Sequence, residues 1–204
     1  MSPRRSVTDA RETRSAILAR GVELATVEGL DGLTIGRLAA DLGLSKSGVL
    51  GHFGAKEALQ LAVIDTAAEQ FGREVVEPSA GTTPGLPRLR ALCEAWLVYL
   101  THPCGGFFLS AAAEFDRRPG PVRDAIAGMS ALWQRDLRMH ITLALADGDL
   151  TGDADQILFN LVGTVLAANH ALHLTGDAQA LPHARHALQT QLPTSPPTLT
   201  RQQP

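Results

Sequence analysis

Hydrophobic residues recur every three or four positions along most of the chain, in runs separated by glycine, proline and polar residues. This spacing places apolar side chains on one face of an α-helix. Alternating runs of Val, Ile and Thr, which are typical of half-buried β-strands, do not occur in the sequence. The pattern therefore predicts an all-α protein with about nine helices.

Two short helices joined by a tight turn are predicted between residues 34 and 53. Thr34 and Ser45 can each cap the free N–H groups of a helix with a side-chain oxygen. Gly43, between them, can adopt the left-handed conformation that turns the chain. The first of these helices is expected to bury one apolar face, made of Ile35, Leu38, Ala39 and Leu42.

Seven further helices follow from the same spacing, together with capping, Gly and Pro signals. The first is expected to begin at Thr8 or Asp9 and to end before Gly29, and the eighth is expected to start at Asp153, which forms a capping-box-like pair with Gln156. The others are expected over residues 55–77, 86–100, 107–115, 121–147 and 177–192. Residues 193–204 are rich in proline and polar residues, and are expected to be disordered.

The window from Thr34 to Leu59 resembles a known family. Its pattern is Thr-Ile, then Leu-Ala-x-x-x-Gly-Leu-Ser-Lys-Ser-Gly-Val, then His-Phe-x-x-Lys-Glu-x-Leu, which is similar to the N-terminal domain of the tetracycline-repressor (TetR) family. The likeness extends from about Arg11 to Leu61. It implies a helix-turn-helix DNA-binding domain over residues 1–54 and a helical ligand-binding and dimerisation domain over 55–192, followed by the tail.

The resemblance implies that the second short helix reads DNA as a recognition helix. Direct contacts are expected from its cap and first turn, and phosphate contacts from Thr34, His52 and Lys56. The family usually has an aromatic residue where this chain has Leu50, and a larger residue at Gly51. We therefore expect more reliance on an N-terminal arginine arm. The expected DNA-binding residues are Arg4, Arg5, Thr34, Ser45, Lys46, Ser47, Gly48, Gly51, His52 and Lys56, with Arg11 and Arg14 as further arm residues.

The charge of the chain gives no general attraction to DNA. The formal net charge of the chain is -3. Residues 1–60 hold eight Lys or Arg and seven Asp or Glu, so their net charge is +1 and that of the remaining residues is -4. Because salt screens charges beyond about 8 Å, a few well-placed cations matter more than the total. Any affinity for DNA must therefore come from local placement of charge.

The resemblance also implies a homodimer on a palindromic operator and a small-molecule effector. The small residues Gly163, Ala167 and Ala171 recur every four positions, so another helix could approach closely; burial within one chain is the alternative. The expected dimer interface is Val162, Gly163, Leu166, Ala167, Ala171 and Leu174. The expected effector pocket is lined by Trp96, Phe107, Phe108, Met129 and Trp133, although aromatic residues at helical spacing can equally be ordinary core.

A cytoplasmic location is expected, because the N-terminus is not followed by the apolar run of a secretory signal. Cys93 and Cys104 are then expected to be reduced thiols. The segment from Ile157 to Leu174 is long enough to cross a bilayer and has no Asp, Glu, Lys or Arg. Its Asn and His residues and its acidic flank argue against a membrane span and favour burial against the core or a partner.

Other classes of function receive less support. The pairs His170/His173 and His183/His186 could each share one helix face, which leaves a metal-sensing regulator as an alternative, but no third ligand is signalled. The sequence contains no phosphate-binding glycine loop, nucleophile elbow or acid–base pair, so no enzyme activity and no cofactor are expected. The sequence thus predicts a ligand-responsive DNA-binding regulator, namely a repressor released by a small apolar or amphipathic effector.

Overall fold

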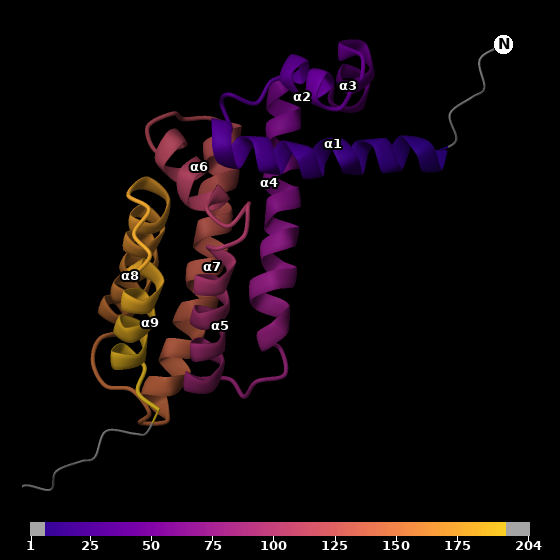
Figure 1. Cartoon of the computed structure of the whole chain (residues 1–204). Coiled ribbons are helices and arrows are strands. Elements are labelled where there is room, and N and C mark those ends of the chain that lie inside the picture. The colour runs from indigo at the N-terminus through magenta and orange to yellow at the C-terminus, as the bar shows by residue number, and fades with distance from the viewer. Residues whose placement is uncertain (1–6, 195–204) are drawn as a thin grey trace, which may run out of the picture. The chain divides into compact units, whose positions relative to one another are not determined.

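The computed structural model describes residues 7–194, and within this range it contains helices and no strand (Figure 1). The all-α prediction is confirmed. The helices are α1 Val7–Glu28, α2 Ile35–Asp41, α3 Lys46–Phe53, α4 Lys56–Phe71, α5 Leu86–Tyr99, α6 Phe107–Phe115, α7 Pro121–Ala146, α8 Ala154–Leu174 and α9 Ala180–Gln191, with a π-helix at Gly72–Val76 and a 3-10 turn at Glu77–Ser79 after α4.

The chain divides into two compact units that do not follow a single cut along the sequence. Within the described residues, the first unit combines the chain up to Gln70 with His102–Ser130, and the second combines Phe71–Thr101 with the chain from Ala131 onward. Helix α6 and the start of α7 thus belong with the N-terminal helices. The linear division after residue 54 remains a prediction about functional domains.

The first unit is built around one hydrophobic core. Helices α1 to α4 supply buried residues such as Ile17, Leu38, Val49 and Leu59, and α6 supplies Phe107. Gly21 allows α1 and α4 to cross closely, because a Cβ atom at this position would lie 2.7 Å from a methyl carbon of Val63. The packing of these helices fixes the position of the short helices α2 and α3.

Local hydrogen bonds define the α2–α3 pair as predicted. The Thr34 hydroxyl accepts from the backbone N–H of Arg37 at 3.1 Å, and the Ser45 hydroxyl accepts from Gly48 at 3.0 Å. Gly43 has a φ of 63° and ends α2. The N–H of Leu44 reaches back to the carbonyl of Ala39 at 2.8 Å, and that of Gly43 to Ala40 at 3.4 Å, which is a Schellman cap. The expected caps and turn are confirmed.

Helix α4 ends earlier than its hydrophobic spacing predicts. The α-helical hydrogen bonding stops at Phe71 rather than at Glu77, and the chain continues as the π-helix Gly72–Val76. The Phe71 ring packs edge to face on Tyr99 and Trp133, with centroids 5.4 and 5.0 Å away. A π-turn inserts an extra residue into the helix, so the residues that follow are rotated relative to the predicted stripe.

The second unit contains α8 packed along α9, with α5 against both. The Arg185 guanidinium forms an ion pair with Glu94 at 2.6 Å, and Arg90 Nε donates to the carbonyl of Leu192 at 2.9 Å, so α5 holds both the middle and the end of α9. Helix α9 begins at Ala180 rather than at the predicted Asp177, because the Asp177 carboxylate accepts from the N–H of Gln179 and forms a turn.

Two glycines of the helix-turn-helix allow a matched test of this backbone. A Cβ atom at Gly51 or at Gly54 would meet no atom of the described chain within 4 Å, but Gly54 has a φ of 74° and Gly51 lies inside α3. We expect Gly51→Ala to raise the free energy of unfolding by about 0.5–1 kcal/mol, because alanine favours a helix. Gly54→Ala should lower it by roughly 1–2 kcal/mol, because alanine is strained at positive φ.

Urea denaturation followed by circular dichroism measures both changes. Equal effects of the two substitutions would contradict the assignment of Gly54 as a C-cap of α3 that requires positive φ.

Candidate functional site

The first turn of α3 is exposed and carries the hydroxyl groups expected to meet DNA. Ser45, Lys46 and Ser47 are all exposed. The Ser45 oxygen accepts the Gly48 N–H and lies 3.2 Å from the Ser47 oxygen, so the two hydroxyls are linked in one capping group. A Cβ at Gly48 would lie 3.1 Å from the Ser45 oxygen. The glycine therefore leaves room for the cap.

Lys46 is the exposed cation at this end of α3. It takes part in no ion pair within the described part of the chain. Its alkyl chain runs over α2, because a Cβ at Gly36 would lie 3.2 Å from the Lys46 Cε. Sequence reasoning missed Gly36, whose only signal was a glycine inside a helix. Its effect is to let the end of the Lys46 side chain, including the ammonium nitrogen 3.6 Å from the same Cβ position, lie against α2.

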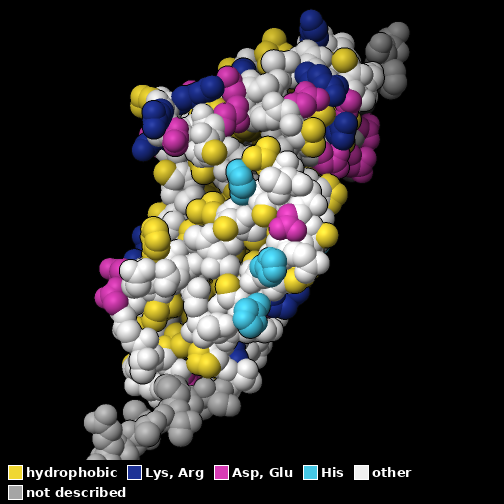
Figure 2. All heavy atoms as spheres, turned by 60° about the vertical axis from the view of Figure 1, so that its left-hand side comes forward, with side chains coloured by type: hydrophobic (Ala, Val, Ile, Leu, Met, Phe, Trp, Pro, Cys, Tyr) yellow, Lys and Arg dark blue, Asp and Glu magenta, His cyan; other side chains and the backbone are white. Residues whose placement is uncertain are grey.

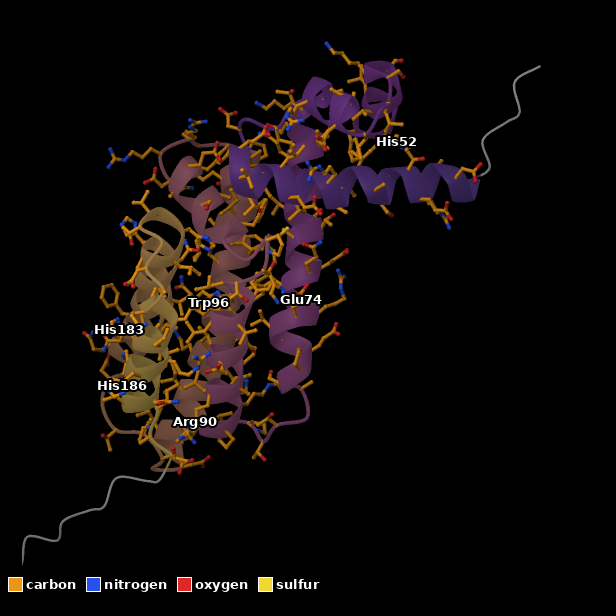
Figure 3. The ribbon with its side chains drawn as sticks, in the orientation of Figure 1. His52, Glu74, Arg90, Trp96, His183 and His186 are labelled. Carbon is orange, nitrogen blue, oxygen red and sulfur yellow. The ribbon has the colours of Figure 1, made fainter. Side chains whose placement is uncertain are left out.

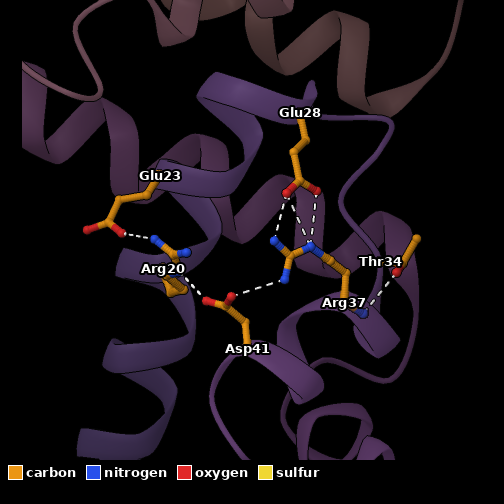
Figure 4. A network of polar contacts seen from close by, with 6 residues as sticks. All are labelled: Arg20, Glu23, Glu28, Thr34, Arg37 and Asp41. Atoms are coloured by element: carbon orange, nitrogen blue, oxygen red, sulfur yellow. Dashed lines mark hydrogen bonds and ion pairs between the residues drawn. The ribbon is translucent and has the colours of Figure 1, made fainter.

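Two arginines near the helix-turn-helix are engaged with carboxylates (Figure 4). Asp41 accepts from Arg37 at 3.0 Å and also from Arg20. Arg37 reaches further to Glu28 at 2.8 Å, and Arg20 reaches to Glu23. The Arg20 guanidinium, followed by that of Arg37, lowers the pKa of the Asp41 carboxyl. These ion pairs connect α1 to α2.

A second ion-pair group holds the start of α4. The Lys56 ammonium, expected to meet a phosphate, donates to the carboxylate of Asp31 at 3.0 Å and to its carbonyl. Arg118 reaches the same carboxylate at 2.8 Å. The Glu114 carboxylate accepts from the backbone N–H groups of Leu30 and Asp31 at 2.8 and 2.9 Å. The sequence gives no signal for the Glu114 contacts, because Glu114 lies more than 80 positions away from Leu30 and Asp31.

The other expected DNA-binding residues lie in varied surroundings. Arg4 and Arg5 are outside the described residues. Arg11 and Arg14 lie on α1, and the Arg14 guanidinium stacks 5.1 Å from the ring centroid of Phe53. Thr34 and Gly51 are exposed, and His52 is half-buried on α3, as labelled in Figure 3. The roles of these residues toward DNA stay predictions.

The five residues expected to line an effector pocket fall into two groups. Trp96 and Trp133 lie in the second unit, where their rings meet edge to face at 5.2 Å (Trp96 is labelled in Figure 3). Phe107 is buried in the core of the first unit, and Phe108 and Met129 are partly buried against that core. The Phe107 and Phe108 rings pack on each other at 5.1 Å. The structure thus joins Trp96 to Trp133 and puts the other three residues in a separate cluster.

A buried histidine that sequence reasoning missed lies close to this tryptophan pair along α7. His140 is 1 % exposed, and its Nδ1 accepts the backbone N–H of Gly85 at 3.2 Å. Burial is the main cause that lowers its pKa; Arg88 also lowers it and Asp136 raises it. The i, i+4 spacing of Asp136 and His140 on an apolar helix was the available signal.

The residues expected at a dimer interface lie on the face of α8 that points away from its own unit. None of the six is buried within the described chain, and a Cβ at Gly163 would meet no described atom within 4 Å. Figure 2, which turns the α8 and α9 side forward, shows hydrophobic and histidine side chains there with few charges between them. Of the described helices, α8 is long and apolar enough to cross a membrane, and 22 % of its apolar window is buried.

The histidine pairs do not gather a metal site. His183 and His186 lie on α9 and are exposed (Figure 3). In the described part of the chain, no group of three or more His, Cys, Asp or Glu side chains could hold a metal ion. His173 instead lies 3.2 Å from the carbonyl of Leu100. The metal-sensing alternative therefore gains no support from the arrangement of these side chains.

Comparison with known proteins identifies the class to which this two-unit helical architecture belongs. Residues 17–63 match the family model of bacterial regulatory proteins of the tetR family, and residues 85–188 match the tetracyclin repressor-like C-terminal domain. No curated protein matches the sequence.

Several solved structures share the fold. A TetR transcriptional regulator from Chloroflexus aurantiacus J-10-FL is 26 % identical, with a TM-score of 0.83 and coverage of 93 % of this chain and 98 % of that one. AibR, solved with isovaleryl coenzyme A and operator DNA, is 20 % identical, with a TM-score of 0.74 and coverage of 88 % and 97 %. The ketosteroid regulator KstR2 of Mycobacterium tuberculosis is 16 % identical, with a TM-score of 0.68 and coverage of 88 % and 93 %.

The fold and the two domain matches define a helical transcriptional regulator. The chain belongs to the TetR family, and the resemblance drawn from the sequence is confirmed.

The ion pairs of Asp41 predict sensitivity to acid. Because Arg20 and Arg37 lower its pKa in the folded state, the stabilisation is present above the ordinary carboxyl pKa of about 4 and is lost as the pH falls further. We expect the urea midpoint of the protein to fall below about pH 4, and to fall less in Asp41→Asn. An unchanged pH dependence in the variant would show that this network does not contribute.

Proposed function

We propose that the protein is a repressor that binds a palindromic operator as a homodimer and releases it when a small effector binds. The single observation that carries this proposal is the exposed first turn of α3, where Lys46 and two serine hydroxyls face solvent while the body of the helix is packed through Val49 and Phe53. The solved complex of AibR with operator DNA supports the same use of the fold. On this proposal the protein acts in the cytoplasm and has no catalytic role.

We propose that some contacts position the protein on the DNA phosphates and that others read the base sequence. Lys46 can meet a phosphate or a guanine edge, and the Ser47 hydroxyl can meet backbone or base. Leu50, which is 45 % exposed, presents only a methyl-bearing surface to the groove. Because Arg20, Arg37 and Lys56 are held by carboxylates, the attraction for DNA depends strongly on Lys46 and on the proposed arm residues Arg4 and Arg5.

A homodimer is proposed because the recognition helix α3 is short. One short recognition helix reads too few base pairs for specificity, and two helices related by a two-fold axis match a palindrome. The exposed apolar face of α8, with Leu166 and Leu174 46 % and 72 % exposed, is proposed to pair with the same face of a second copy. Gly163 and Ala167 would allow the two helices to approach closely. This pairing would cover the surface that makes α8 resemble a membrane span.

Effector control is proposed to act through α4. Phe71, its last residue, packs on Trp133 and Tyr99 of the second unit, while Leu59, Val63 and Ala67 of the same helix are in the core of the first. A ligand that moves the tryptophan pair would therefore act on one end of a helix whose other end supports α2 and α3. The π-helix after Phe71 provides a local change of helix register at this point.

Lys46→Ala tests the proposed DNA contact. With a fragment of the region upstream of the protein's own gene, we expect weaker binding and a salt dependence whose slope is lower by about 1 for each recognition helix. Fluorescence anisotropy over a series of salt concentrations measures both. Arg73→Ala, which removes an exposed cation from the π-helix, is the matched control and should leave the slope unchanged. Equal slopes for Lys46→Ala and the natural protein would remove Lys46 from the phosphate contacts.

Leu166→Arg tests the proposed dimer. A charge buried at the centre of a helix pairing is costly, so sedimentation should show a monomer at concentrations where the natural protein is a dimer. Leu50→Arg, on α3, changes a side chain of the same exposure, 45 % against 46 %, and should remain dimeric. A dimeric Leu166→Arg protein would contradict the α8 interface.

A further inference from the structure

Several buried polar atoms of the second unit lack hydrogen-bond partners within the described part of the chain, and four of these atoms lie where α5 faces α7. These four are Arg88 Nε, Trp133 Nε1, Asp136 Oδ2 and His140 Nε2. Buried donors and acceptors in folded proteins are nearly always paired, and each exception calls for an explanation. Four such atoms in one region are therefore a stronger signal than one isolated atom.

The four side chains form a row between α5 and α7. Trp133, Asp136 and His140 are spaced i, i+3 and i+7 and so share one face of α7. The N-terminal end of α5 is fixed beside His140 by the hydrogen bond from Gly85, and its later part is fixed beside Trp133 by the contact with Trp96. The two helices are thus antiparallel along this row, and Arg88, one turn into α5, lies opposite its polar end.

The chemistry of the row is set by its donors, acceptors and charges. His140 Nδ1 accepts a backbone N–H, so in the neutral ring the proton is on Nε2. His140 Nε2 lies 3.9 Å from Asp136 Oδ1, which is beyond hydrogen-bond distance. The unpaired atoms are then three N–H donors and one carboxylate oxygen. The charges of Arg88 and Asp136 cancel formally, and burial lowers the pKa of His140, which favours its neutral form. The row therefore favours an uncharged group that both accepts and donates hydrogen bonds.

The surroundings of the row are aromatic. The Phe71 and Trp96 rings both meet the Trp133 ring edge to face, at 5.0 and 5.2 Å, and Tyr99 packs on Phe71. Such rings present both edges and faces to a flat ring of a ligand. One end of the row thus suits an aromatic ring and the other suits its polar substituent.

We propose that this row binds the polar end of the effector, and that the effector is an uncharged aromatic compound bearing a hydroxyl group, as in a phenol. The hydroxyl oxygen accepts a hydrogen bond from Trp133 or His140, and the hydroxyl proton is donated to Asp136. A ligand carboxylate would place a second negative charge beside Asp136. A hydrocarbon would leave all the polar atoms of the row unpaired. The inference rests on the proposed function, in that it names the ligand class of the regulatory unit.

The first experiment compares three probes of nearly equal shape: 4-ethylphenol, ethylbenzene and 4-ethylbenzoate. Trp96 and Trp133 are the two tryptophans of the chain, so intrinsic fluorescence reports on this site, and calorimetry of the full-length protein gives the affinities. We expect 4-ethylphenol to bind at least about tenfold more tightly than either of the others, because one well-placed hydrogen-bonding group gives that discrimination. Equal binding of ethylbenzene, tighter binding of the benzoate, or no binding of the phenol would overturn the proposal.

The second experiment uses Asp136→Asn, which removes the carboxylate and keeps the side-chain shape. We expect this variant to bind 4-ethylphenol about tenfold more weakly and to bind ethylbenzene with unchanged affinity. Asp65→Asn, at an exposed position on α4, is the matched control. Should Asp136→Asn fail to fold, Trp133→Phe keeps an aromatic ring, removes the N–H donor and leaves Trp96 as the reporter. An unchanged preference for the phenol in a folded variant would overturn the assignment of the row.

These measurements contain no DNA, so they separate this inference from the proposed function. Binding of 4-ethylphenol that requires Asp136 supports the ligand class even if the protein does not release an operator. Operator binding by a protein without phenol preference supports the proposed function and overturns the ligand class.

Discussion

The carboxylate of Glu114 accepts hydrogen bonds from two successive N–H groups, those of Leu30 and Asp31, at the turn that follows α1. This contact requires Gly29 before the turn, since its φ is 85° and a Cβ there would lie 3.1 Å from the carboxylate. Asp31 in turn is held by Lys56 at the start of α4. One residue of α6 therefore fixes the end of α1, the approach to α2 and the start of α4. The grouping of His102–Ser130 with the N-terminal helices depends on this contact and on the core around Phe107.

Local chemistry is what made most of the fold predictable from sequence. The caps at Thr34, Ser45 and Asp153 and the turn at Gly43 depend on residues within a few positions of each other, and the structure confirms them. The end of α4 was not predictable in this way. A four-residue spacing continues through Val75, but the aromatic contacts of Phe71 with residues of α5 and α7 accompany a π-helix. Such long-range packing leaves no trace in the local pattern.

The candidate sites were predictable to different degrees for the same reason. The exposed turn at Lys46 follows from a motif, whereas the pairing of Lys56 with Asp31 requires knowing which loop lies beside α4. Likewise Trp96 and Trp133 were identified from helical spacing, but Phe107, at an equivalent kind of position, belongs to another cluster. His140 occupies a buried position on α7, and its spacing in the sequence does not distinguish it from a core residue. Its unpaired Nε2 is visible only when its neighbours are known.

The distribution of paired and unpaired groups separates the two tasks of the protein. In the first unit, carboxylates hold Arg20, Arg37 and Lys56, which stabilises the α1–α2–α4 arrangement and leaves Lys46 exposed. In the second unit, the polar atoms beside the tryptophan pair are buried and unpaired within the described chain. Satisfied polar groups rigidify a structure, and unsatisfied ones lower its stability until a partner binds. A ligand that pairs with the second set would therefore gain binding energy at Trp133, the residue on which Phe71 of α4 packs.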